Sequence, residues 1–270
     1  MEPAPHPISL RKKTHSRLEK LIASKMQRLL NRVCNDSYYN SYSEEILVNP
    51  KESNLYCYGD DKILKLSFHN TGTCDFMKKL NPIPLYDVDG IHFHNFHTKN
   101  RKILDFFLHS FPREVNFMTI SANIFQHINI SYYFDSFCTI SSSVRNKVSL
   151  WRFKFTENQL KKFLVSYKHV KVVSLSCCYI SIPHVINFSR ALKNTQIKRL
   201  DFVMSKFSRS NDLSKMHGEF KNLMESLATS PDLKLSLQGL SIARANVEKD
   251  KALNIIREAG FSQIKLCGFI

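Results

Sequence analysis

Glycine is scarce in this chain, and the motifs that many enzyme classes need are missing. Only seven of the 270 residues are glycine, and no two of them stand two positions apart. That spacing excludes G-x-G-x-x-G, and the sequence contains no phosphate-binding loop, no G-x-S-x-G and no H-E-x-x-H. Nothing in the sequence supports catalysis. We therefore expect a protein that is not an enzyme and that carries no cofactor and no metal.

Long apolar runs and paired cysteine motifs are also missing. Nowhere do about 18 apolar residues follow one another, and Met1–Pro7 holds Glu2 and three prolines where a secretory signal needs an apolar core. The seven cysteines are odd in number and form no C-x-x-C pair, which argues against a disulfide framework and a zinc ribbon. We expect reduced thiols and a cytoplasmic or nuclear location.

What the chain does contain is a repeated phrase. An apolar residue is followed by apolar residues at the fourth and sixth positions, by Asn or Cys at the ninth, and by another apolar residue at the eleventh. The clear copies begin at Val115, Leu150 and Val170, with Asn123, Asn158 and Cys178 at their ninth positions. Weaker copies begin at Ile63, Val88, Ile197, Leu237 and Ile264.

The spacing of these copies supports a repeat architecture. Successive starts are 25, 27, 35, 20, 27, 40 and 27 residues apart. The phrase and its spacing resemble a leucine-rich repeat protein with repeats of ribonuclease-inhibitor-like length. The resemblance implies an α/β fold, a curved solenoid with parallel strands and outer helices, and a general role in binding proteins. A doubly wound α/β sheet stays the alternative, because strand and helix alternation alone does not exclude it.

The phrases also predict where the elements lie. We expect parallel strands, stacked in chain order, near residues 88–94, 115–121, 150–156, 170–176, 197–203 and 237–243. Helical spacing after the strands predicts helices around Ile103–Phe111, Leu160–Leu164, Val185–Leu192, Phe220–Leu227 and Ala252–Ala259. The two polar stretches Thr139–Lys147 and Ser205–Lys215 coincide with the longest intervals, and we interpret them as surface insertions.

The amino-terminal part of the chain has a different character. Ser16 and Glu19 form a capping-box pattern, and apolar residues then recur at helical spacing through residues 16–35, opposite a face of lysine and arginine. We divide the chain into a basic helix and linker at 1–59 and a repeat region at 60–270. The helix is interpreted as a cap on the first repeat, a membrane-surface segment or a partner-binding helix.

Basic residues dominate the charge of the chain. The formal net charge is +16, and residues 1–34 hold eight Lys or Arg against two Glu. Such an excess suits nucleic acid, an anionic membrane surface or an acidic protein, and it also favours solubility. We expect no transmembrane segment.

The predicted register places polar side chains on the concave sheet face. Small hydroxyls with interspersed cations suit an acidic or phosphorylated protein partner. His69, His92 and His94 would lie on neighbouring strands, but the pattern places no fourth ligand, and we predict no metal site. The candidate partner-binding residues are Arg152, Lys154, Arg199, Trp151, His92 and His94. The predicted function is a noncatalytic protein-protein interaction module or scaffold; the alternative is nucleic-acid or anionic-lipid binding through the amino-terminal helix.

Overall fold

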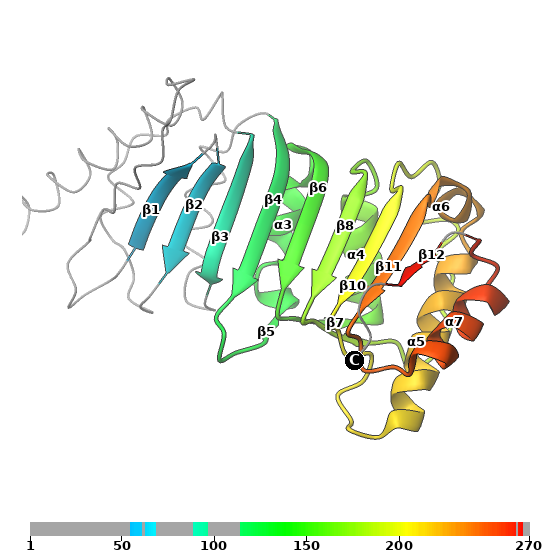
Figure 1. Ribbon diagram of the computed structural model, residues 1–270. Helices are drawn as coiled ribbons and strands as arrows, with labels where there is room; N and C mark the ends of the chain where they lie inside the picture. The colour runs from blue at the N-terminus through cyan, green and yellow to red at the C-terminus, as the bar shows by residue number, and fades with distance from the viewer. Residues whose placement is uncertain (1–54, 61–62, 69–88, 97–113, 263, 267–270) are drawn as a thin grey trace, which may run out of the picture.

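A nine-stranded sheet forms the body of the molecule (Figure 1). The computed structural model describes residues 55–60, 63–68, 89–96, 114–262 and 264–266, so the predicted amino-terminal helix and the predicted helix at 103–111 lie outside the described residues. The strands follow the order β1-β2-β3-β4-β6-β8-β10-β11-β12. Their bounds are β1 Leu55–Asp60, β2 Ile63–Phe68, β3 Gly90–Phe96, β4 Val115–Ala122, β6 Val144–Trp151, β8 Val172–Ser176, β10 Arg199–Val203, β11 Gly239–Ala243 and β12 Ile264–Leu266.

Neighbours from β2 to β12 are parallel, whereas β1 pairs antiparallel with β2. The parallel strands stack in chain order, as the sequence predicted. Sequential stacking means that each strand returns beside its predecessor after one crossover. The result is a mixed α/β fold with a largely parallel sheet.

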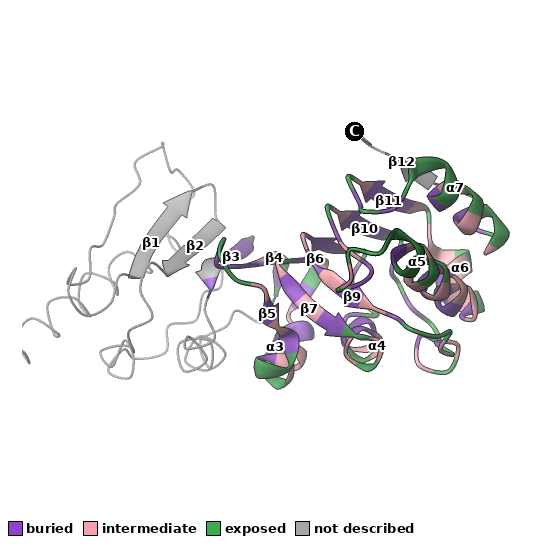
Figure 2. Cartoon of the chain, turned by 90° about the horizontal axis from the view of Figure 1, so that it is seen from below, coloured by how far each residue is buried: buried purple, intermediate pink, exposed green. Residues whose placement is uncertain are grey.

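Helices and a second, smaller sheet complete the described structure. The helices are η3 Ile130–Tyr132, α3 Phe134–Ser141, α4 Glu157–Ser166, α5 Leu213–Ala228, α6 Pro231–Ser236 and α7 Lys249–Glu258. Strands β5 Ile128–Asn129, β7 Phe153–Thr156 and β9 Tyr179–Ser181 form the small parallel sheet, which lies at the edge where the main strands end (Figure 2). Helices α3 and α4 lie behind the main sheet in the view of Figure 1.

The hydrophobic core lies between the main sheet and these helices. Alternate residues of the strands from β3 to β11 point into it, such as Met118 and Ile120 of β4, which are fully buried. Side chains of β8 and β10 meet α4 and α5 around one small apolar cavity, lined by Leu160, Leu164, Val173, Leu175, Leu200, Phe202, Leu223 and Leu227. Among the described residues, helices lie on one face of the main sheet only, and no described helix covers the other face (Figure 1).

The strand predicted at 150–156 is wrong. Met118 pairs with Val148 and Ile120 pairs with Leu150, so Leu150 occupies the sixth position of the phrase and not the first. The chain leaves the main sheet after Trp151 and enters β7 of the small sheet. Leu64 pairs with Ile91, and Leu240 pairs with Ile264, so the copies beginning at residues 63 and 264 were also out of register.

Three further predictions are wrong. Thr139–Lys147 is no insertion, because it comprises the end of α3 and the first half of β6. Asn158 stands in the first turn of α4, and Phe153 takes the ninth position instead. The helix predicted at 185–192 is absent from that described segment, where Phe188 and Leu192 nevertheless reach the core from an irregular chain.

Buried hydroxyl and thiol groups form hydrogen bonds with backbone groups in the turns after the strands. Ser205 is fully buried; its hydroxyl donates to the carbonyl oxygen of Leu175 at 2.9 Å and accepts from the backbone N–H of Cys178 at 3.3 Å. Asn123 takes the equivalent position after β4, where its side-chain oxygen accepts from the N–H of Phe125 at 2.9 Å. Serine therefore also suits the ninth position of the phrase, because a short polar side chain can reach backbone groups that the turn leaves without a partner.

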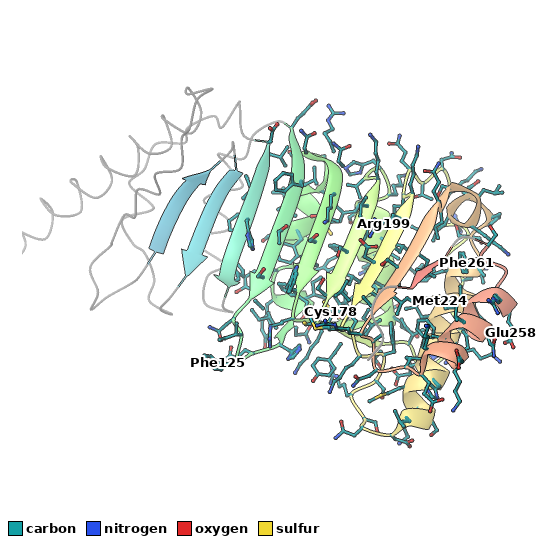
Figure 3. The ribbon with its side chains drawn as sticks, in the orientation of Figure 1. Phe125, Cys178, Arg199, Met224, Glu258 and Phe261 are labelled. Atoms are coloured by element: carbon teal, nitrogen blue, oxygen red, sulfur yellow. The ribbon has the colours of Figure 1, made fainter. Side chains whose placement is uncertain are left out.

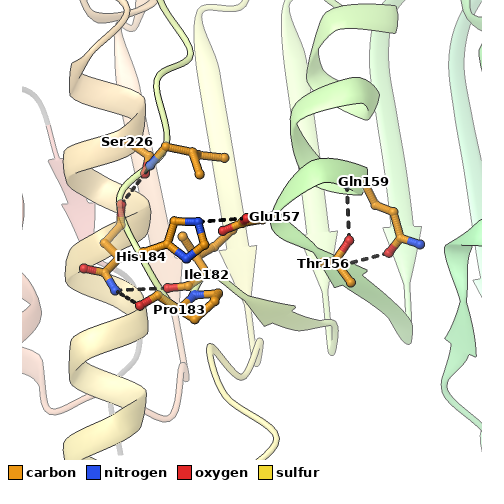
Figure 4. Close-up of polar contacts among 9 residues, drawn as sticks. Thr156, Glu157, Gln159, Ile182, Pro183, His184 and Ser226 are labelled. Atoms are coloured by element: carbon orange, nitrogen blue, oxygen red, sulfur yellow. Dashed lines mark hydrogen bonds and ion pairs between the residues drawn. The ribbon is translucent and has the colours of Figure 1, made fainter.

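The connection from β7 to α4 is fixed by a capping box (Figure 4). The Thr156 side chain accepts from the N–H of Gln159, whose side chain in turn accepts from the N–H of Thr156. Glu157 then lies 3.0 Å from His184 of the irregular segment, and the Ser226 hydroxyl of α5 accepts from the N–H of Ile186. These contacts, rather than the predicted helix, connect the irregular segment to α4 and α5.

Candidate functional site

One face of the main sheet carries polar side chains in register and includes several of the predicted site residues. We define the open face as the side chains of β3, β4, β6, β8, β10 and β11 that alternate with the core residues. Its central row runs across the strands in register: His92, Thr119, Ser149, Ser174, Asp201 and Ser241. Small side chains dominate this row, and Ser149, Ser174, Asp201 and Ser241 are largely buried among their neighbours.

The row nearest the amino-terminal ends of the strands carries cations and one aromatic ring. It consists of Gly90, Phe117, Lys147, Val172, Arg199 and Gly239. Phe117 lies over Gly90, where an added Cβ would overlap the ring, so glycine is required for this packing. Lys147 and Arg199 are both exposed.

One ion pair lies within the open face. The Arg199 Nε lies 2.6 Å from the Asp201 Oδ1, and the Asp201 side chain is 9% exposed. Asp201 stands between Ser174 and Ser241 in the register. Because a nearly buried carboxylate needs a partner, Arg199 is held in place rather than left free to swing.

The third row lies toward the carboxyl ends of the strands. Trp151 pairs in register with Ser121 and Ser176 and is 38% exposed. The Ser121 Oγ also lies 3.1 Å from Nε2 of His92. A half-exposed indole beside two hydroxyls offers apolar area with polar neighbours, a combination that is typical of interface anchors.

The structure divides the six predicted residues. His92, Trp151 and Arg199 lie on the open face, and His94 lies on β3 with its side chain outside the described residues. Arg152 and Lys154 do not lie there, because β6 ends at Trp151 and Lys154 belongs to β7 of the small sheet. Their predicted placement on the concave face is therefore wrong, and the binding role of all six stays a prediction.

Sequence reasoning missed Lys147 and Phe117. Lys147 had been assigned to an insertion, and Phe117 stands at a position where the phrase specifies nothing. The signal that could have found Lys147 is the pair Val148 and Leu150, which repeats Met118 and Ile120 at an interval of 30 residues. Reading that interval would have placed Lys147 beside Phe117.

Thiols and titratable groups offer little reactive chemistry in the described part of the chain. Burial raises the pKa of Cys178 to about 12, and burial also raises the pKa of Cys138 and of Cys177. A thiol with a raised pKa is a poor nucleophile at neutral pH. Among the residues with described positions, no three His, Cys, Asp or Glu side chains gather in a way that could hold a metal ion.

Comparisons with known proteins add little to this picture. No family model matches the sequence, and no curated protein matches it. One solved structure similar to this chain is the Toll–Spatzle complex of Drosophila, a molecular hub in development and innate immunity; the identity is 14% and the TM-score 0.40. The match covers 80% of this chain but 30% of the other, so the chain spans less than a third of that neighbour. A likeness at this level carries no argument about function.

A membrane-crossing helix is not found among the described residues. None of their helices is long and apolar enough to span a bilayer.

Proposed function

We propose that this protein is a noncatalytic interaction module of the leucine-rich-repeat type, whose open sheet face binds a protein partner. The observation that carries the proposal is the in-order parallel sheet with helices on one face and side chains of low bulk on the other. A rigid strand array presents its side chains without the cost of ordering loops on binding. We place the protein in the cytoplasm or nucleus.

The charges of the open face favour an acidic partner. Lys147 and Arg199 stand in one row, with Val172 between them in the register. Asp201 neutralises part of the Arg199 charge, whereas Lys147 forms no ion pair with any residue that the structure describes. An acidic segment along this row would meet Lys147 first and could share Arg199 with Asp201.

A site-specific photocrosslinker locates the interaction surface. We expect a crosslinking amino acid at Thr119, which is partly exposed on the open face, to capture one protein of definite mass from the native cell extract. The matched position is Lys162, which is exposed on α4 on the helical side. Capture from Lys162 but not from Thr119 would contradict the proposal, because the partner would then contact the helices.

A further inference from the structure

Two lysines flank a tyrosine at the edge where the main strands end. Lys154 of β7 pairs in parallel register with Tyr179 of β9, and Tyr179 forms a bridge with Lys206 in the turn after β10. Each of the three follows a ninth-position residue of its repeat, namely Phe153, Cys178 and Ser205. The repeat geometry therefore builds a row, lysine, tyrosine, lysine, from segments 25 and 27 residues apart.

The side chains of this row contact one another. The Lys154 Nζ lies 6.0 Å and the Lys206 Nζ lies 5.7 Å from the centroid of the Tyr179 ring. The His127 ring packs edge to face on Tyr179 with centroids 4.3 Å apart, and its Nε2 lies 3.0 Å from the carbonyl oxygen of Cys177. Contacts from both sides hold the tyrosine ring in a fixed orientation.

Positive charge gathers here, and no acidic side chain of the described residues compensates it. Arg152, Lys154 and Lys206 form no ion pair with any acidic side chain of the described residues. All three lie close enough to lower the pKa of His127, after the larger effect of burial. Like charges held together raise the local potential, and a bound anion would relieve their repulsion.

Exposed apolar side chains border these cations. Arg152 Nη1 donates to the carbonyl oxygen of Ile124 at 2.7 Å, which fixes the turn that carries Phe125. Phe125 is 85% exposed and Ile124 is 56% exposed, and Figure 3 shows Phe125 pointing away from the sheet at this edge. Exposing a phenylalanine side chain to water is unfavourable, and a partner that covers the ring would gain the free energy of burying it.

We propose that this edge binds single-stranded nucleic acid. Its residues are Phe125, Arg152, Lys154, Tyr179 and Lys206, which we term the edge cluster. Backbone phosphates lie against the three cations, and a base stacks on the exposed ring of Phe125. An acidic peptide would neutralise the cations equally well, but it lacks the regular flat rings of bases, one of which would cover the exposed Phe125 ring. The edge cluster is separate from the open face, and the proposal does not rest on the protein-binding function.

Fluorescence anisotropy with a labelled single-stranded 15-mer oligouridylate and the full-length chain tests the proposal. The Lys154→Gln/Lys206→Gln variant should weaken binding and lower the slope of log affinity against log salt by about 2, since each lost phosphate contact lowers it by about 1. The matched control is Lys171→Gln/Lys198→Gln, which removes the same charge from exposed lysines at the opposite edge of the sheet. The control should bind like the wild type.

Phe125→Ser separates stacking from charge. We expect about tenfold weaker binding with an unchanged salt slope, because base stacking on one aromatic ring contributes about 1–3 kcal/mol. Unchanged circular dichroism confirms that each variant folds. Equal losses in both lysine variants, or no loss in either, would place binding elsewhere, for example on residues 1–34, and overturn the proposal. Full displacement of the oligonucleotide by an oligoglutamate of equal charge, with no effect of Phe125→Ser, would assign the edge to an acidic protein and overturn it too.

Discussion

Individual side chains, rather than glycine residues, stabilise the turns that follow the strands of this fold. After four successive main-sheet strands the chain turns through a non-glycine residue with positive φ: Arg152, Cys177, Met204 and Arg244, at 65°, 51°, 50° and 51°. Left-handed backbone at such residues costs free energy that surrounding bonds must outweigh. Buried hydroxyls such as that of Ser205 supply some of those bonds. The Asn and Cys rule predicted part of this chemistry, but the serine variant became visible only once its partners had been placed.

At the same scale, His127 gives the protein a specific pH dependence. Burial, with a smaller contribution from nearby Arg152, Lys154 and Lys206, lowers the pKa of His127 below 6.5. The unfolded histidine keeps a pKa near 6.5, so between the two values the unfolded state binds more protons and stability rises with pH. The His127 contribution is therefore complete above about pH 6.5 and decreases as the pH falls through that value.

Urea unfolding of the wild type and of His127→Gln from pH 5 to pH 8 measures this contribution. We expect the wild type to lose more unfolding free energy than the variant as the pH falls below about 6.5. Identical pH profiles would show that His127 does not carry the effect.

At the scale of elements, the sequence located most strands, but it could not fix their register everywhere. Leu150, Phe153 and Phe155 match the first, fourth and sixth positions of the phrase, whereas the pairing of the strands places them at the sixth, ninth and eleventh positions, with Phe153 where the phrase expects Asn or Cys. Only the pairing of Leu150 with Ile120 and Leu175 decides between the two registers. The small sheet escaped prediction because β5, β7 and β9 are two to four residues long, too short for a period to appear. Because the predicted register was wrong here, the position of Lys147 on the open face was not predicted.

Neighbouring substitutions in β8 test the register that the structure establishes. Leu175→Asp should unfold the protein, because it buries an unpaired charge in the core between β8 and the helices. Ser174→Lys, one residue away, should leave the fold intact, because that residue lies on the open face beside Asp201 in the register. Thermal melting of the two variants decides the matter, and equal loss of stability in both would contradict the assigned faces.

At the scale of the whole molecule, sequential stacking separates the structure into a helical side and an open sheet side. The repeat spacing predicted this arrangement, since each repeat supplies one strand and buries its apolar face against its neighbours. The role of residues 1–54 stays a prediction, because they lie outside the described residues. Partner identity could not come from either source, because a general fold does not specify what its surface binds.

The most direct test of the account is the affinity of the captured partner for variants of the two sides. Lys147→Gln/Arg199→Gln removes two cations from the open face, and Lys161→Gln/Lys162→Gln removes two from α4 on the helical side. Titration calorimetry should show at least about fivefold weaker binding for the open-face variant, since a contributing interface residue is worth more than about 1 kcal/mol. The α4 variant should bind like the wild type. Full affinity in the open-face variant together with a loss in the α4 variant would contradict the central claim that the open sheet face binds the partner.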